Sequence, residues 1–468
     1  MRKSLLVVLA AAPACFAGGW TRLTTPHFEM VTTATAAEGR EAILYFERVR
    51  SFFLQASPLH KTTDKPVRIV AFHSAEEFAP YRTGEMDVAY YATERRWNYI
   101  AMEGIGAGYY PVAIHEFTHL MVDESGLKLP LWLNEGWADV YSTLRAAGAG
   151  KFIVGNVIEG RVEELRKGRW IPLRALTAAG RGSDLYNEPR DVGMFYAESW
   201  ALAHLLYLSP EYGPRFASFL AGISAGQSMD QACRGELGRS LERVESDLHA
   251  YLDRRKLMGL EFTVKTSVTG MEPVVAAMTE LESGLAKADL WSAIHKDAKA
   301  VDEYDWLRGR YPERPEVDES LGYRAWDNGD QGGARRHFAL AVKKGTKDAR
   351  MCYDYARLER AAGDPGRRAE TALQRALWLK PDYAAARIEL GRLWMERGQY
   401  AAAVEELRRV KRVAPEQAVA YYLAMAEGYS KTGHPEEARE EARIAKTWAR
   451  TAGESERAEA VLRTAGGR

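Results

Sequence analysis

The feature that most constrains the fold is a repeated pattern of small residues in the last third of the chain. Four glycines recur at intervals of 34, 35 and 35 residues: Gly329, Gly363, Gly398 and Gly433. A small residue precedes each glycine by seven positions, and these residues are Gly322, Ala356, Gly391 and Ala426. A fixed period of this length is typical of solenoids, in which each repeat packs only against its neighbours. The pattern therefore predicts a helical array.

This pattern resembles the tetratricopeptide repeat. Further alanines follow the glycines at Ala334, Ala369, Ala403 and Ala438, and Pro381 and Pro415 close the middle units. Small residues let paired helices approach closely, and a glycine permits the turn between them. The resemblance implies an all-α solenoid over residues 315–450 that binds a protein partner. We expect residues 266–314 to be a helical linker or degenerate repeat and residues 451–468 to be a C-terminal tail.

A second pattern, His115-Glu116-Phe117-Thr118-His119, lies in an apolar run that Pro111 is placed to begin as a helix. Residues four apart share one face of a helix, so His115 and His119 can offer two imidazoles to one metal ion. A catalytic zinc site needs a third protein ligand and an open position for water. The pattern alone lacks that third ligand.

Glu135 lies 16 residues after His119, a spacing that leaves room for a turn and a second helix alongside the first. Asp139 follows on the same helical face, where it can accept a hydrogen bond from a ligand imidazole. Together these positions predict a metal site with a carboxylate partner behind it.

The two segments together resemble the gluzincin zinc metallopeptidases, and residues 129–138, Leu-Pro-Leu-Trp-Leu-Asn-Glu-Gly-Trp-Ala, resemble their peptidase-MA-like branch, which includes proteins classed by a domain of unknown function. The resemblance implies an α+β thermolysin-like zincin domain over residues 18–265, with a small mixed sheet and active-site helices. It implies Zn²⁺ bound by His115, His119 and Glu135. It also implies that Glu116 is the general base and that Asp139 supports a ligand.

Two further residues are candidates for the same site. Tyr196 is the candidate donor of a hydrogen bond to the oxyanion, and the alternative is a tyrosine packed in the interior. His204 is the next histidine after His119, and its apolar surroundings predict a core residue instead of a catalytic one.

Alternating apolar residues predict strands at 27–32, 67–72 and 97–102, with an extended piece at 261–266. Helical spacing predicts helices over 36–54, 75–78, 158–167, 194–208, 214–221 and 241–251. In metallopeptidases of this design, an edge strand pairs with the substrate backbone. Residues 97–102 are placed either as that edge strand or as an ordinary interior strand.

Lysine plus arginine and aspartate plus glutamate both number 64, so bulk charge gives no pull toward nucleic acid or anionic membranes. Residues 1–17 have a basic start and a short apolar core, which predict an export signal and no membrane span after its removal. Lipidation at Cys15 is an alternative. Cys233 and Cys352 are expected to be buried thiols without a disulfide.

These observations predict an exported zinc-dependent metallopeptidase that hydrolyses a protein or peptide substrate, with repeats that bind that substrate or a partner protein. The alternative function is a catalytically silent zinc-binding scaffold or adaptor that acts through its repeats.

Overall fold

The computed structural model describes residues 19–466 except 60–64, 86, 149, 253–256, 258, 267, 269 and 364–366. The chain divides into two compact units, residues 1–300 and 301–468. The predicted export signal at residues 1–17, with Cys15, lies outside the described residues. A search of the described helices for one long and apolar enough to cross a membrane finds none.

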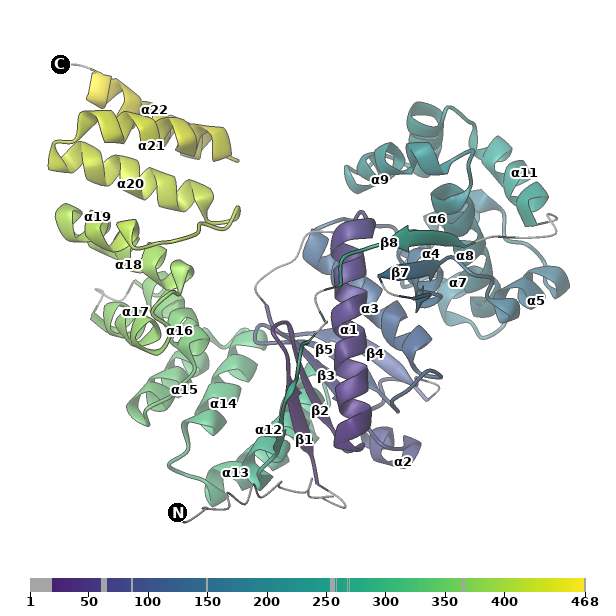
Figure 1. The fold of residues 1–468 in the computed structure, drawn as a ribbon, viewed down its shortest axis with the longest axis horizontal. Coiled ribbons are helices and arrows are strands. Elements are labelled where there is room, and N and C mark those ends of the chain that lie inside the picture. The colour runs from purple at the N-terminus through teal and green to yellow at the C-terminus, as the bar shows by residue number, and fades with distance from the viewer. Residues whose placement is uncertain are drawn as a thin grey trace, which may run out of the picture. The chain divides into compact units, whose positions relative to one another are not determined.

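A mixed sheet forms the base of the first unit (Figure 1). Its strands are β1 (Thr21–Thr24), β2 (Phe28–Thr32), β3 (Val67–Ala71), β4 (Ala89–Thr93), β5 (Asn98–Met102) and β9 (Val274–Ala277). They lie in the order β4-β5-β3-β2-β1-β9. The three central strands β5, β3 and β2 are parallel, and the pairings at both sides of them are antiparallel. The predicted strands at 27–32, 67–72 and 97–102 are confirmed, and β1, β4 and β9 were not predicted.

Helices cover both faces of this sheet. Met30 and Ile69 pair in register and pack with α1 (Ala36–Ala56) and α3 (Tyr110–Ser125) in one apolar core. The next residues, Val31 and Val70, point to the opposite face and pack with Leu290 of α12 (Glu280–Ala293). Alternation along the strands therefore buries both faces, as parallel sheets require.

The segment 266–314 contributes more than a linker. Strand β9 pairs with β1, and α12 covers one face of the sheet, so both belong to the first unit. A capping box begins α12, since the Thr279 side chain accepts from the backbone of Glu282 and the Glu282 side chain accepts from the backbone of Thr279. Helix α13 (Asp297–Arg310) crosses the boundary between the units.

The rest of the first unit is mainly helical. Its helices are α2 (Ala75–Phe78), α4 (Leu131–Ser142), α5 (Glu159–Lys167), α6 (Leu173–Ala178), α7 (Asp184–Asn187), α8 (Val192–Leu208), α9 (Phe216–Ser224), α10 (Met229–Ala232) and α11 (Leu241–Leu252). Short turns η1 (Ala79–Tyr81), η2 (Gly213–Arg215) and η3 (Cys233–Leu237) connect some of them. A small antiparallel sheet has the order β6 (Arg145–Ala146), β7 (Lys151–Val154), β8 (Leu260–Thr263).

Close packing of α4 on α8 fixes the position of the residues around Glu135. Gly136 lies so near α8 that a Cβ atom there would stand 2.1 Å from the backbone oxygen of Ser199. Trp132, Trp137 and Trp200 from the same two helices are fully buried. The two helices therefore form a rigid support for the side chains that α4 presents.

The second unit is a series of helix pairs. They are α14 (Pro315–Asp327) with α15 (Gln331–Lys343), α16 (Ala349–Ala361) with α17 (Arg367–Leu379), α18 (Ala384–Glu396) with α19 (Tyr400–Arg408), and α20 (Ala418–Thr432) with α21 (Pro435–Trp448). The four predicted turn glycines all have positive φ, between 70° and 83°. A Cβ atom at Gly322 would stand 2.4 Å from the ring of Phe338, so the predicted close approach of paired helices is confirmed.

The predicted tail at residues 451–468 forms a helix over most of its length, α22 (Ala452–Gly466). Its apolar residues Ala458, Val461 and Ala465 follow helical spacing and are buried against α20 and α21. The prediction of a tail was therefore wrong, because this amphipathic stripe packs the segment against α20 and α21 as a helix.

Candidate metal centre

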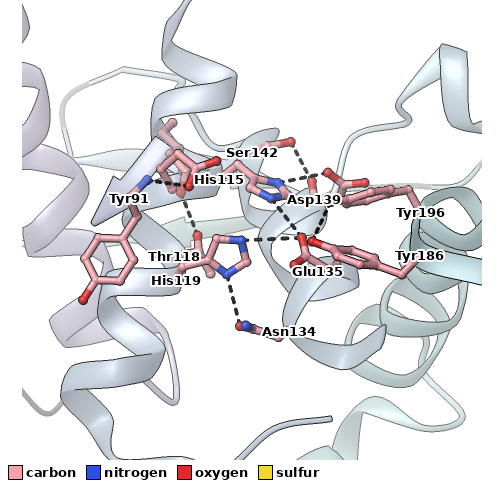
Figure 2. Close-up of polar contacts among 12 residues, drawn as sticks. Tyr91, His115, Thr118, His119, Asn134, Glu135, Asp139, Ser142, Tyr186 and Tyr196 are labelled. Atoms are coloured by element: carbon pink, nitrogen blue, oxygen red, sulfur yellow. Dashed lines mark hydrogen bonds and ion pairs between the residues drawn. The ribbon is translucent and has the colours of Figure 1, made fainter. Parts of the chain in front are cut away.

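Helix α3 presents both histidines of the predicted site. It begins with Pro111 near its N-terminus and ends at Gly126, whose φ of 74° permits the left-handed cap. His115 and His119 lie one turn apart, with ring centroids separated by 4.8 Å. The helix that the sequence predicted therefore places both imidazoles on one side, facing α4 (Figure 2).

Helix α4 brings Glu135 to the two imidazoles. Glu135 Oε2 lies 3.4 Å from His115 Nε2 and 3.6 Å from His119 Nε2. Bonds of about 2.0–2.1 Å to a tetrahedral zinc ion would place ligand atoms about 3.3 Å apart. Among the described residues, this trio is the group whose donor atoms gather closely enough to hold one metal ion. The residues present thus fit a zinc ion.

The outer nitrogen of each imidazole has its own partner. His115 Nδ1 lies 3.1 Å from Asp139 Oδ1, and His119 Nδ1 lies 3.2 Å from Asn134 Oδ1. These contacts fix Nδ1 as the protonated nitrogen and leave Nε2 of both rings toward Glu135. Arg161 on α5 donates from Nε to Asp139 Oδ2 at 2.8 Å. The supporting role predicted for Asp139 has the geometry it needs.

Burial and charge oppose each other in this cluster. Burial lowers the pKa of His115, but hydrogen bonds to Asp139 and Glu135 outweigh it and raise the pKa to about 10. Burial raises the pKa of Glu135, but hydrogen bonds to the two histidines outweigh it and hold the pKa far below its ordinary value. The opposed pKa shifts of His115 and Glu135 show that these two groups are strongly coupled.

Glu116 lies beside the histidines on the side of the sheet. Its Oε2 accepts a hydrogen bond of 2.9 Å from the backbone N–H of Tyr91 on β4. Burial raises the pKa of Glu116, while the charges of His115 and His119 lower it to a smaller extent. The carboxylate is therefore held between the edge strand and the metal ligands as a stronger base than an exposed glutamate.

Strand β4, and not residues 97–102, forms the edge of the sheet next to α3. Strand β5 lies between β4 and β3, so the interior alternative for residues 97–102 is confirmed and the edge-strand alternative is wrong. The sequence did not predict β4 because its five residues, AYYAT, show no strict alternation of apolar and polar residues.

A cavity of about 600 Å³ opens over these groups. His115, Glu116, Asp139, Arg161 and Tyr196 line it. Much of the remaining wall is apolar, with Val88, Ala89, Val112, Val157 and Ile158. A concave apolar site with a few convergent polar groups is the usual form of a ligand site.

Tyr196 on α8 lines this cavity, and its role as an oxyanion donor stays a prediction. Its Oη lies 3.5 Å from the hydroxyl of Tyr186, and Arg161 Cζ lies 4.9 Å from the centre of its ring. Burial and the charge of Glu135 raise its pKa far above the ordinary value, so the hydroxyl keeps its proton. The ring also packs against the apolar core of the unit, as the alternative of an interior tyrosine predicted.

His204 is a core residue, as predicted. It is fully buried, with Nδ1 3.0 Å from the Tyr251 hydroxyl and Nε2 2.8 Å from the Gly155 carbonyl oxygen. Cys233 and Cys352 are buried free thiols, as expected.

Three neighbours of the site were not assigned a role from the sequence: Asn134, Arg161 and Tyr186. Asn134 directly precedes Glu135, and that adjacency was the signal available for it. Arg161 lies in a helix predicted only by periodicity, and Tyr186 lies between two such predicted helices. Nothing in their local sequence indicates a site.

The comparisons with known proteins concern the repeats. A family model described as a tetratricopeptide repeat matches residues 366–427, within the second unit. A search of curated proteins gives no match. Tetratricopeptide repeats are therefore present in the chain, and proteins that contain them bind other proteins or peptides.

Several solved structures resemble part of the chain. YrrB, a tetratricopeptide-repeat protein with an unusual peptide-binding site, has 19% identity and a TM-score of 0.33, and the match covers 38% of this chain and 90% of YrrB. MamA has 21% identity and a TM-score of 0.31, covering 36% of this chain and 91% of MamA. PilF of Pseudomonas aeruginosa has 16% identity and a TM-score of 0.31, covering 40% of this chain and 87% of PilF.

Proposed function

We propose that the first unit is a zinc-dependent peptidase of the gluzincin type with a thermolysin-like zincin fold, and that the repeats bind its substrate or a partner protein. One observation carries the proposal: His115, His119 and Glu135 gather in one cluster, and His115 and the neighbouring Glu116 line one cavity. Two histidines and a glutamate with an open position are the ligands of catalytic zinc in metallopeptidases. When bound, zinc supplies a Lewis acid and lowers the pKa of water toward about 7.

Glu116 is the general base in this proposal. It takes a proton from the attacking water as the new C–O bond forms at the carbonyl carbon. It then returns that proton to the amine nitrogen, the C–N bond breaks, and the carbonyl re-forms in the product carboxylate. The N–H of Tyr91 fixes one of its oxygens at 2.9 Å, which orients the carboxylate before substrate arrives. Tyr196 retains its proton and donates a hydrogen bond to the oxygen of the scissile carbonyl.

Strand β4 is the proposed docking strand for substrate. It is the edge strand beside α3, and Ala89 in it lines the cavity. An edge strand offers unpaired backbone groups to an extended peptide. The apolar wall around Val112 and Ile158 favours an apolar substrate side chain next to the cleaved bond.

Arg161 and Asp139 act through His115. Asp139 accepts from His115 Nδ1 and from Arg161 Nε, so the arginine holds the carboxylate that orients the ligand ring. The proposal also includes export, which rests on the basic and apolar composition of residues 1–17.

The test is proteolysis by chain lacking residues 1–17, compared with the Glu116→Gln variant. Purified protein is expected to hold about one zinc ion per chain, measured by mass spectrometry of the metal, and to cleave unfolded casein. Glu116→Gln is expected to retain the zinc and to lose about 10²-fold or more of the cleavage rate. Cleavage at the wild-type rate by Glu116→Gln would overturn the assigned mechanism.

The second candidate function is a silent zinc-binding scaffold that acts through its repeats. The family match supports it, because that match lies in the repeats and not around His115. A scaffold would bind zinc and cleave nothing in a broad peptide library, and zinc removal would lower its melting temperature without changing partner binding. A pull-down with residues 315–468 that returns no protein would count against any recruiting role for the repeats.

A further inference from the structure

One edge of the repeat unit carries exposed apolar side chains. Leu340, Trp378 and Trp448 are 43%, 70% and 41% exposed, and each lies near the C-terminal end of the second helix of a pair. Trp378 and Trp448 are two repeat periods apart, so they occupy the same position in different repeats. Large exposed aromatic side chains at a repeated position form a row along a solenoid.

Basic residues accompany these side chains. We define the joining edge as the four stretches where one repeat passes into the next or into α22, residues 340–348, 375–383, 408–416 and 443–451. These stretches contain twelve basic and three acidic residues. The opposite turn edge, residues 326–334, 360–368, 395–403 and 430–438, contains five basic and six acidic residues. The whole chain has a formal net charge of zero, so the excess of basic residues at the joining edge is a local concentration of positive charge.

Helix capping explains only part of this charge. Lysine and arginine stabilise the C-terminal turn of a helix through its dipole, and Lys343 and Lys446 lie in such turns. However, α19 ends at Arg408, and the exposed side chains of Lys411 and Arg412 lie beyond it. Helix dipoles also give no reason to expose Trp378.

We propose that the joining edge binds the surface of an anionic lipid bilayer. Tryptophan is favoured at membrane interfaces because its ring is apolar and its N–H is polar, and lysine and arginine next to it are attracted to anionic headgroups. Arg375 Cζ lies 4.6 Å from the ring centre of Trp378, so a cation and an aromatic ring are presented together. Binding is peripheral and places the repeats along the membrane surface.

The joining edge fits a bilayer better than a nucleic acid. Proteins that bind single strands use a basic groove with aromatic side chains inside it, to which successive bases stack. Here Trp378 and Trp448 stand on the ends of separate helices, and neither lines the cavity between α18, α19, α20 and α22. A row of helix ends can contact a flat surface at several points at once.

The experiment measures binding of the full chain to vesicles by co-sedimentation. One set of vesicles contains phosphatidylcholine with phosphatidylglycerol, and the other contains phosphatidylcholine alone. We expect binding to the mixed vesicles only, weakening as salt is added. Trp378→Ala with Trp448→Ala is expected to weaken binding about tenfold, since binding scales with inserted apolar area.

Two pairs of charge substitutions give a matched control. Lys411→Ser with Arg412→Ser, on the joining edge, is expected to weaken binding about tenfold or more. Arg367→Ser with Arg368→Ser, on the turn edge, removes the same charge and is expected to leave binding unchanged. Circular dichroism of each variant checks that the helices remain folded.

Three results would overturn the proposal. The first is no binding to the mixed vesicles, including the case in which the chain binds single-stranded DNA or an acidic peptide instead. The second is equal loss from both pairs of charge substitutions, which would indicate adsorption through net charge. The third is unchanged binding after loss of both tryptophans.

Discussion

Contacts in the first unit join residues far apart in the sequence, whereas contacts in the second unit join neighbours. In the first unit Thr24 pairs with Val274, and the candidate metal centre draws on α3, α4, α5 and α8. In the second unit each helix packs mainly against the helix next to it along the chain. A site that combines several functional groups needs the first kind of packing, while an extended binding surface can grow from the second.

The largest expected difference between the units follows removal of the metal. Chelation is expected to abolish peptide cleavage and to lower the stability of the first unit by about 4 kcal/mol, if zinc is present at about 1,000 times its dissociation constant. The second unit is expected to unfold at the same temperature with and without chelator. Scanning calorimetry measures both transitions. In the His119→Ala variant, the chelator is expected to leave both unfolding temperatures unchanged. A shift of both transitions in wild type would contradict the expected difference between the two units.

Glycine substitutions probe how each unit tolerates added volume. Gly136→Ala would place Cβ 2.1 Å from the backbone oxygen of Ser199, so α4 and α8 must separate, at a cost of about 3 kcal/mol. Gly391→Ala would meet only the side chain of Leu407, at 2.6 Å, and a gain in helix propensity of about 1 kcal/mol offsets much of the strain.

Urea unfolding measures both effects. Gly136→Ala is also expected to weaken zinc binding, since Glu135 is the preceding residue on α4, whereas Gly391→Ala is not. Equal destabilisation by the two substitutions would show that α4 and α8 adapt as readily as a repeat.

Asp139 and Asp318, which each contact the Nδ1 atom of a partly buried histidine, offer a matched pair. Asp139→Asn is expected to weaken zinc binding about 10–100-fold, because it disturbs the hydrogen bond that orients His115. Asp318 holds His337 Nδ1 at the same distance of 3.1 Å in the second unit. Asp318→Asn is expected to leave zinc affinity unchanged. Competition with a chromogenic chelator measures both affinities, and equal affinities for wild type and Asp139→Asn would remove the role of Asp139.

Glu198 in the first unit predicts a smaller difference between the two units, in how their stability depends on pH. Burial raises its pKa to about 8, although the backbone N–H of Ile171 opposes this shift. The folded state therefore holds the proton more tightly than the unfolded chain, whose glutamate has a pKa near 4.5. The contribution of Glu198 to the stability of the folded state is fully present below pH 4.5. It is lost as the pH rises from 4.5 through about 8, by up to about 1.4 kcal/mol per pH unit.

Glu198→Gln mimics the protonated side chain and is expected to flatten this dependence for the first unit. The melting temperature is measured between pH 6 and pH 9 in separate buffers. We expect it to change by a few degrees across this range in wild type and to stay nearly constant in the variant. An identical slope in wild type and variant would assign the pH dependence to other groups.

Patterns that repeat locally could be predicted well. The glycine period predicted the turns of the array, and the pairing of His115 with His119 predicted one face of α3, because both depend on residues a few positions apart. Glu135 could be proposed from its spacing to His119, and the family resemblance then implied that it is a metal ligand. Geometry then places its Oε2 within 3.6 Å of both imidazoles.

Other parts of the first unit could not be predicted because they depend on distant partners. Strand β9 is four residues long, and it becomes a strand by pairing with β1, which lies at the other end of the unit's sequence. Arg161 acquires its place in the site from the packing of α5 on α8, which no local signal encodes. In the second unit, the helix at 452–466 was missed because its apolar residues are mostly small alanines.

The pairing of β1 with β9 also sets an order for folding during synthesis. Strand β1 leaves the ribosome early, but its outer partner is complete only at Ala277, and α12 follows later still. Until then, β1 presents an unpaired edge and Val31 and Val70 lack the helix that covers them, a state prone to pairing with other chains. The growing chain therefore has a long interval in which a chaperone that shields this sheet would raise the yield of folded protein.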